Sequence, residues 1–301
     1  MTTAPADFHG IFPYLVSPID EATGQVREAV LRDLIAHLIG QGVHGLSPLG
    51  STGEIVYLTA EQRAALVRAT IDAVGGRVPV VPGVSAYSTT DALRQAEALV
   101  NLGVDGLIVM LQTQFPVSRV GIERYFRTIA ESVPVPVVLY TNPGLGGADV
   151  TPEIVEALSH VPNIRYVKDA SGRTGRILAI LNRVGDRVKV FSASAHIPAV
   201  VFQLGGVGWM AGPACVIPRE SVALYELARQ GRWDEAFAMQ RPLWRLNELF
   251  EKYSLAACIK TALEIQGFAV GGPIAPQEPL PAAAIEEIRA GLAALNGMAN
   301  R

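Results

Sequence analysis

The sequence predicts an α/β protein, a (β/α)8 TIM barrel followed by an all-helical C-terminal extension. Three observations lead to this fold class. Short apolar runs alternate with helix-like stretches up to residue 215, the runs recur at intervals of roughly thirty residues, and strand-like runs stop after Arg219. Because 50% of the 301 residues are hydrophobic and only 18% are charged, the chain can bury a core of this size.

Eight apolar runs are rich in Val and Ile and do not alternate with polar residues, as expected of parallel strands that are buried on both faces. The predicted strands span residues 10–16, 43–49, 78–84, 104–111, 135–141, 164–170, 188–194 and 207–212. Right-handed helical crossovers allow such strands to close into a barrel. A doubly wound open sheet is the alternative, but no run has the character of an edge strand.

Helices are predicted between these strands and after the last of them. They cover residues 26–39, 60–74, 90–102, 118–130, 152–158 and 175–184 in the barrel, and 221–230, 233–250, 255–266 and 282–295 in the extension. Thr59, Thr89 and Thr151 are predicted N-cap residues, and Pro152 takes the favoured first position of its helix. The chain therefore divides into a barrel domain at residues 1–220 and a helical extension at residues 221–301.

The charge balance argues against polyanionic partners. Twenty-five basic and 28 acidic residues leave a net charge of −3, which gives no long-range attraction to nucleic acid or to anionic membranes. Residues 190–218 contain no Asp, Glu, Lys or Arg, a length that would span a bilayer. Pro and Gly residues divide this stretch, however, which indicates a buried helix, strand and loop. The N-terminus shows no secretory signal, so we expect a cytoplasmic protein.

No metal or organic cofactor is predicted. The five His residues are scattered without ligand spacing, and no GxGxxG or Walker pattern for phosphate binding is present. Cys215 and Cys258 lie in apolar surroundings, where a cytosolic protein carries buried, reduced thiols.

Active sites of such barrels lie at the C-terminal ends of the strands, so the residues that close the apolar runs are candidates for catalysis. The sequence IRYVKDASG places Lys168 at the end of the sixth predicted strand. A partly desolvated lysine has a lowered pKa, and its neutral amine can attack a carbonyl to form a Schiff base. An ion pair between Lys168 and Asp169 is the alternative interpretation.

Polar groups also lie at or near the ends of two further apolar runs. VVLYTNPG puts Tyr140 at the end of the fifth predicted strand, where a phenol can pass protons to and from a substrate; a core aromatic residue is the alternative. LGSTGE flanks Ser51 and Thr52 with glycines, so that backbone N–H groups and two hydroxyls can bind a carboxylate, although a simple connecting loop has the same pattern. Glu54 either orients this loop or is a solvated carboxylate.

The segments GSTGE, LYTNPG, YVKDASG and FQLGGVG, in this order, resemble the dihydrodipicolinate synthase/N-acetylneuraminate lyase family of class I, Schiff-base-forming barrel enzymes. The resemblance implies an imine between Lys168 and pyruvate or another 2-oxo acid, a proton relay through Tyr140, and a homo-oligomer, commonly a tetramer. It implies these site residues: the catalytic Lys168, Tyr140 and Ser51, and the substrate-binding Gly50, Thr52 and Met210.

Three places depart from the family. Thr113 and Gln114 lie in the loop after the fourth predicted strand. In the synthase, this loop contributes a tyrosine across the subunit interface to the proton relay of the neighbouring subunit. Leu145 stands where the synthase has an arginine for the carboxylate of its aldehyde, and an apolar side chain cannot replace that ion pair. Residues 194–196 lack the acidic groups that hold the sugar in sialic acid lyases.

The leading hypothesis is therefore a carbon–carbon or carbon–oxygen lyase, an aldolase or dehydratase, that forms an imine on Lys168 and uses Tyr140 as proton shuttle. One alternative is synthase-type condensation of pyruvate with an aldehyde, for which Leu145 favours an apolar aldehyde. The other is a catalytically silent barrel that binds a small 2-oxo acid.

Overall fold

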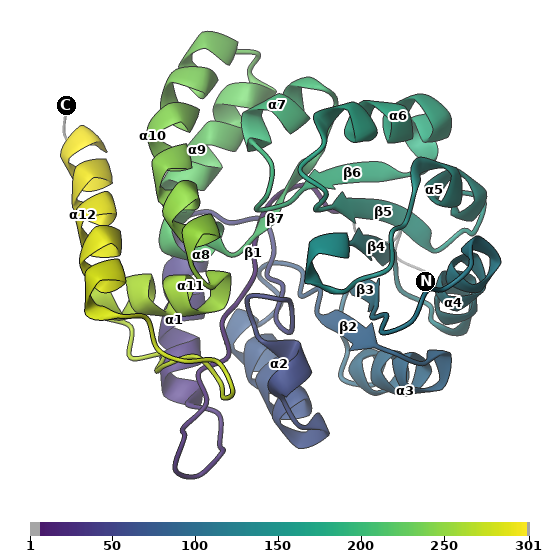
Figure 1. The fold of residues 1–301 in the computed structure, drawn as a ribbon, viewed down its shortest axis with the longest axis horizontal. Coiled ribbons are helices and arrows are strands. Elements are labelled where there is room, and N and C mark those ends of the chain that lie inside the picture. Colours follow the sequence, from purple (N-terminus) through teal and green to yellow (C-terminus); the bar gives the residue numbers. More distant parts are fainter. Residues whose placement is uncertain (1–6, 300–301) are drawn as a thin grey trace.

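Seven parallel strands form a curled sheet in the order β1-β7-β6-β5-β4-β3-β2, surrounded by helices (Figure 1). The strands are β1 (Gly10–Pro13), β2 (Gly83–Ala86), β3 (Leu107–Leu111), β4 (Val137–Thr141), β5 (Ile164–Asp169), β6 (Lys189–Ser192) and β7 (Gly208–Ala211). This computed structural model describes residues 7–299, so residues 1–6 and 300–301 of the two predicted domains lie outside the described residues. The predicted barrel fold is confirmed.

The second predicted strand closes the gap between β1 and β2 without forming a regular strand. Isolated parallel bridges join Ser47 to Tyr14 on one side and Leu46 to Val80 on the other. Pro48 follows directly and has no N–H for further pairing. The prediction of a full strand here is therefore wrong. The segment nevertheless lies between β1 and β2 and completes the barrel, together with the seven strands.

Helices cover the outside of the sheet and form the C-terminal part of the chain. They are α1 (Glu28–Gly40), α2 (Ala60–Val74), α3 (Thr89–Val100), α4 (Arg119–Ser132), α5 (Pro152–Leu158), α6 (Thr174–Val184), α7 (Pro198–Gln203), α8 (Pro213–Val216), α9 (Pro218–Arg229), α10 (Trp233–Lys252), α11 (Leu255–Ile265) and α12 (Ala282–Ala299). All ten helices predicted individually are present, with ends shifted by at most four residues.

The three predicted N-caps have different outcomes. Thr59 caps α2 in a capping box, because its hydroxyl accepts from the N–H of Gln62 while the Gln62 side chain accepts from the N–H of Thr59. Thr151 is the N-cap of α5 but makes no side-chain capping bond. Thr89 is already inside α3, and Ser88 caps that helix instead by accepting from the N–H of Asp91.

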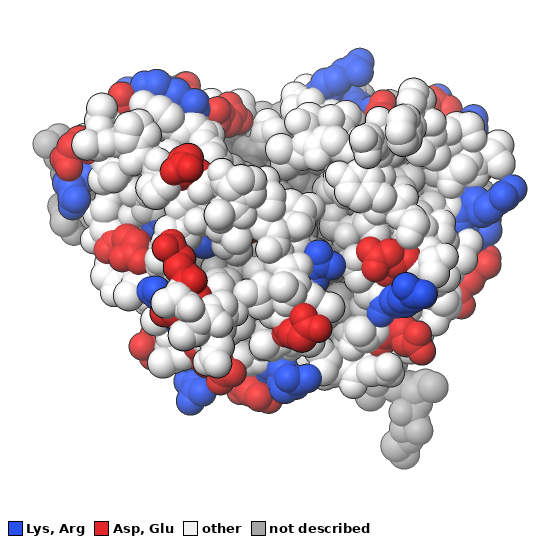
Figure 2. All heavy atoms as spheres, turned by 60° about the horizontal axis from the view of Figure 1, so that its bottom comes forward, with Lys and Arg blue, Asp and Glu red and all other residues white. Residues whose placement is uncertain are grey.

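The uncharged stretch at residues 190–218 folds into the barrel as predicted, and includes α7, β7 and α8. Within residues 7–299, no helix combines the length and the apolar character that crossing a membrane requires. Cys215 in α8 and Cys258 in α11 are both buried and unpaired, as predicted for reduced thiols. On the face shown in Figure 2, acidic and basic side chains are interspersed rather than gathered in a patch of one sign.

The helices after β7 lie against one side of the barrel (Figure 1). Helix α9 contacts β1, α10 packs on α9 and α12, and α11 packs on α8 and α12. The division of the chain at residue 220 stays a prediction.

Aromatic and other apolar side chains fill the barrel interior. This buried cluster consists of Phe8, Phe12, Tyr14, Val81, Ile108, Met110, Val138, Tyr140, Tyr166, Phe191 and Met210. A second, larger cluster lies between the sheet and the helices. Because the interior is packed, space for a ligand is left at the C-terminal ends of the strands.

Candidate active site

Lys168 projects from β5 into an aromatic environment. Its side chain is 2% exposed, and its Nζ lies 3.7 Å from the ring centroid of Tyr14 and 4.1 Å from that of Tyr140. Among the described residues, no carboxylate oxygen is within ion-pair distance of Nζ. The neighbouring Asp169 pairs instead with Arg176, at 2.6 Å. The alternative interpretation of a Lys168–Asp169 ion pair is therefore wrong.

The surroundings of Lys168 favour a neutral amine. Burial removes water from the ammonium form and lowers the pKa of Lys168 well below its ordinary value. The two ring faces attract a cation, but each such contact is weaker than the hydration that the buried amine loses. A neutral amine is the form that attacks a carbonyl.

Tyr140 lies beside Lys168 because β4 and β5 are neighbours and their register pairs the two residues. The hydroxyl of Tyr140 accepts a hydrogen bond from Nδ2 of Asn142 at 2.9 Å. Burial raises the pKa of the Tyr140 phenol, and hydrogen bonds with Ser51 and Asn142 offset part of this effect. The predicted adjacency of Tyr140 and Lys168 is confirmed, whereas Asn142 was not singled out in the sequence.

The LGSTGE loop packs tightly between the ends of two strands, which explains its glycines. A side chain at Gly50 would overlap the ring of Tyr14, next to the end of β1. A side chain at Gly212, which follows β7, would overlap Thr52, which is buried. The hydroxyl of Ser51 thereby reaches the cavity wall beside Tyr140.

Glu54 anchors this loop to the C-terminal extension. Its carboxylate is buried, and Oε2 lies 2.6 Å from Nζ of Lys260 in α11. Oε1 accepts hydrogen bonds at 2.7 Å from the N–H of Ile274 and from the side chain of Gln277. Of the two interpretations of Glu54, a solvated carboxylate is wrong and an orienting role for the loop agrees with the structure.

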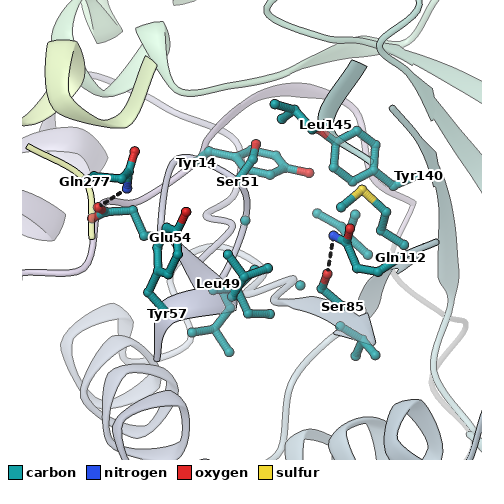
Figure 3. A pocket seen from close by; sticks show the side chains of 17 residues that line it. Tyr14, Leu49, Ser51, Glu54, Tyr57, Ser85, Gln112, Tyr140, Leu145 and Gln277 are labelled. Atoms are coloured by element: carbon teal, nitrogen blue, oxygen red, sulfur yellow. Dashed lines mark hydrogen bonds between the residues drawn. The ribbon is translucent and has the colours of Figure 1, made fainter. Parts of the chain in front are cut away.

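Two cavities meet at this site. The Lys168 cavity, of about 350 Å3, is bounded by the ends of β4 and β5 and by residues 250, 251 and 253–255 of the extension. The adjoining cavity, of about 230 Å3, lies between the LGSTGE loop, β2 and β3 (Figure 3). Tyr14, Ser51, Tyr140 and Leu145 line both. Among the described residues that line them, Lys168 is the only lysine or arginine.

Five of the six predicted site residues line one or both cavities, namely Lys168, Tyr140, Ser51, Thr52 and Gly50. Met210 is fully buried in the barrel interior and is not among the residues that line either cavity. Its role in substrate binding stays a prediction. Tyr14 was missed, because it lies inside the predicted strand at residues 10–16, whereas in the structure β1 ends at Pro13 and Tyr14 follows it.

A buried polar network supports β5 behind Lys168. Arg176 pairs with Asp169 and with Asp149, each at 2.6 Å. His196, also buried, has its Nε2 at 3.8 Å from Oδ1 of Asp169, and burial lowers the pKa of its imidazole. The charge of Asp169 is thus balanced by Arg176. In the described part of the chain, no group of three His, Cys, Asp or Glu side chains is arranged to hold a metal ion.

Comparison with known proteins identifies the family of this barrel. The sequence profile described as the Dihydrodipicolinate synthetase family matches residues 7–295. The chain belongs to this family. A family protein of Methanospirillum hungatei, named 4-hydroxy-tetrahydrodipicolinate synthase, is 35% identical over 269 residues, which cover 88% of this chain and 91% of the relative. A protein of the same name from Methanosphaerula palustris is 32% identical over 286 residues, covering 93% and 98%.

Solved structures of family members share the whole fold. The 4-hydroxy-tetrahydrodipicolinate synthase of Methylacidiphilum fumariolicum superimposes with a TM-score of 0.92 at 26% identity, covering 97% of each chain. YagE, a prophage protein of the family from E. coli K12 solved in complex with pyruvate, has a TM-score of 0.91 at 29% identity, covering 97% of this chain and 99% of its own. The relatives named synthases are enzymes of the lyase class, and the family resemblance expected from the motifs is confirmed.

Proposed function

We propose that this protein is a Schiff-base-forming lyase, in which Lys168 condenses with pyruvate or a related 2-oxo acid. The observation that carries the proposal is the buried amine of Lys168 between two tyrosine rings, at the wall of a cavity and without a carboxylate partner in the described part of the chain. A buried lysine with this arrangement is a nucleophile rather than half of an ion pair. The complex of YagE with pyruvate supports the choice of ligand.

The proposed reaction begins with attack of Nζ on the carbonyl carbon of the 2-oxo acid. The C–N bond forms, and the carbonyl oxygen departs as water with two protons from the amine, which Tyr140 passes on. The imine then withdraws electrons, so that a proton leaves the adjacent carbon. The resulting enamine either expels a hydroxyl from the next carbon or attacks an aldehyde. In the cleavage direction, the same enamine forms when an aldol bond breaks.

Gly50, Ser51 and Thr52 are proposed to bind the carboxylate of the 2-oxo acid. Ser51 and Thr52 line the Lys168 cavity, and Gly50 lines the adjoining one. Hydroxyl and backbone N–H donors hold a carboxylate without a second positive charge near the amine.

Borohydride reduction tests the imine directly. The protein is incubated with pyruvate, reduced, digested and mapped by mass spectrometry. We expect one reduced pyruvyl group, on the peptide that contains Lys168. A label confined to any other lysine, or no label at all, would contradict the proposed function.

Replacing Tyr140 with phenylalanine is expected to slow turnover by roughly 10²- to 10⁴-fold, the usual contribution of a positioned acid–base group. The ring and its contact with Lys168 are kept, so trapping of the imine with borohydride should remain measurable. The matched control is Tyr125→Phe, which removes a buried hydroxyl bound to the carbonyl of Met110. Equal turnover of Tyr140→Phe and native protein would assign Tyr140 to the core.

If the reaction is a condensation, the second substrate is proposed to be an uncharged, apolar aldehyde. Leu145 lines both cavities, and no arginine lines either within the described residues. Without the charged contact that an arginine would make, kcat/KM for aspartate semialdehyde is expected to be lower by roughly 30-fold or more than in a synthase that has the arginine. Pyruvate consumption is measured with both aldehyde types, in native protein and in Leu145→Arg, which should shift the preference toward the semialdehyde. A native preference for aspartate semialdehyde would refute this.

A homo-oligomer is also proposed. Tyr87 and Phe115, on the loops after β2 and β3, are 70% and 74% exposed and supply apolar surface for such contacts. The cytoplasmic location stays a prediction.

A further inference from the structure

Tyr14 has a buried hydroxyl that lacks a hydrogen-bond partner among the described residues. The residue follows β1 and is 1% exposed. Buried polar atoms in folded proteins nearly always have a partner, because an unsatisfied one costs free energy. The hydroxyl of Tyr14 therefore indicates a partner that this part of the chain does not supply.

The other buried tyrosines show that this is unusual for the molecule. The hydroxyls of Tyr125, Tyr140, Tyr166 and Tyr225 each have a hydrogen-bond partner. Those of Tyr125, Tyr166 and Tyr225 lie outside both cavities, whereas Tyr14 lines both of them. The one unsatisfied phenol in the described core is thus also a wall of the site.

The position of Tyr14 makes the substrate the natural partner. Its ring face lies closer to the amine of Lys168, at 3.7 Å, than that of Tyr140, at 4.1 Å. Figure 3 shows the ring of Tyr14 pointing across the cavity toward Tyr140, and the two ring centroids are 6.5 Å apart. Gly50 leaves the space that the Tyr14 ring occupies. A carbonyl group that the amine attacks therefore lies close to both phenols.

We propose that Tyr14 is a further catalytic residue, whose hydroxyl donates a hydrogen bond to the oxygen on the carbon that Lys168 attacks. The inference rests on the proposed function of Lys168. As the nitrogen lone pair forms the C–N bond, the two π electrons of the carbonyl move onto oxygen, and the hydrogen bond stabilises that charge. The oxygen later leaves as water with the two amine protons passed on by Tyr140, while Tyr14 keeps its own proton.

Burial supports this division of labour between the phenols. Desolvation raises the pKa of Tyr14 well above its ordinary value, so the phenol keeps its proton and can donate a hydrogen bond at neutral pH. Within the described residues the Tyr14 hydroxyl has no hydrogen-bond partner, whereas the hydroxyl of Tyr140 accepts from Nδ2 of Asn142 and also bonds with the side chain of Ser51. Stabilisation by a fixed donor therefore fits Tyr14, and proton transfer fits Tyr140.

Tyr14→Phe tests the inference, because it keeps the ring over Lys168 and removes only the hydroxyl. Imine formation is followed by quenching with borohydride at successive times after adding saturating pyruvate, with the label measured by mass spectrometry. We expect the rate to fall roughly 10²-fold, as for loss of one donor to a developing oxyanion, while the final extent of labelling stays close to native. The melting temperature should be unchanged or higher, since an unsatisfied buried hydroxyl is lost.

Tyr166→Phe is the control, since Tyr166 is also buried in the barrel interior but its hydroxyl is bonded to Asp7 and to the N–H of Phe8. It should lower the melting temperature and leave the labelling rate unchanged. A labelling rate of Tyr14→Phe within twofold of native protein would overturn the role of Tyr14 while leaving the Lys168 imine intact. Absence of label in the native protein would instead overturn the proposed function itself.

Discussion

Replacing Lys168 with methionine is expected to abolish pyruvate labelling and to lower turnover by on the order of 10⁴-fold or more, as when the nucleophile of a covalent mechanism is removed. Methionine has a similar length and keeps the contacts with the rings of Tyr14 and Tyr140. The substitution also removes a buried amine without a carboxylate partner in the described structure, so stability should be unchanged or increased. Loss of activity together with retained stability is the signature of a catalytic rather than a structural lysine.

Labelling, turnover and melting temperature are measured on the same preparations. The matched control is Lys252→Met, since Lys252 is an exposed lysine of α10 paired with Glu287. That variant should label at the native rate. Undiminished labelling of Lys168→Met would place the imine elsewhere, and a native protein that is labelled but turns over none of the aldehydes or 3-deoxy-2-oxo sugar acids tested would favour the silent barrel.

Lys260→Met is expected to destabilise the protein by about 3–5 kcal/mol, because it leaves the carboxylate of Glu54 buried without its cation. Both partners are at most 2% exposed, and their atoms are 2.6 Å apart. The pair joins α11 to the LGSTGE loop, so loosening it should also raise the KM for pyruvate more than it lowers kcat. Chemical denaturation measures the free energy of unfolding, and the rate of pyruvate consumption gives the two kinetic constants.

Two further variants isolate the cause. The double variant Glu54→Gln, Lys260→Met removes both charges, and glutamine retains an oxygen for the N–H of Ile274, so most of the lost stability should return. Lys252→Met breaks an exposed pair and should change stability little. If Lys260→Met were no less stable than Lys252→Met, the buried pair would not hold the loop.

Much of the barrel follows from local sequence, because buried strands and amphipathic helices leave separate periodic patterns. The adjacency of Tyr140 and Lys168 was also predictable, since neighbouring parallel strands end side by side. The prediction of the second strand was wrong because the apolar composition of a segment does not show whether its backbone forms a regular hydrogen-bonded ladder with its neighbours. Only the contacts of Leu46 and Ser47 with both neighbours show that the segment bridges the barrel without becoming a regular strand.

The sequence by itself determined the fold class and the family, and it singled out Lys168 as the candidate nucleophile, since these inferences depend on local patterns and short motifs. Only the tertiary structure decided that Glu54 is buried against Lys260 and that Met210 lies outside both cavities. It also decided that the hydroxyl of Tyr14 faces the site without a partner in the described chain. Burial and the pairing of polar atoms depend on residues far apart along the chain, and folding brings these together in ways that the neighbours of a residue in sequence do not specify.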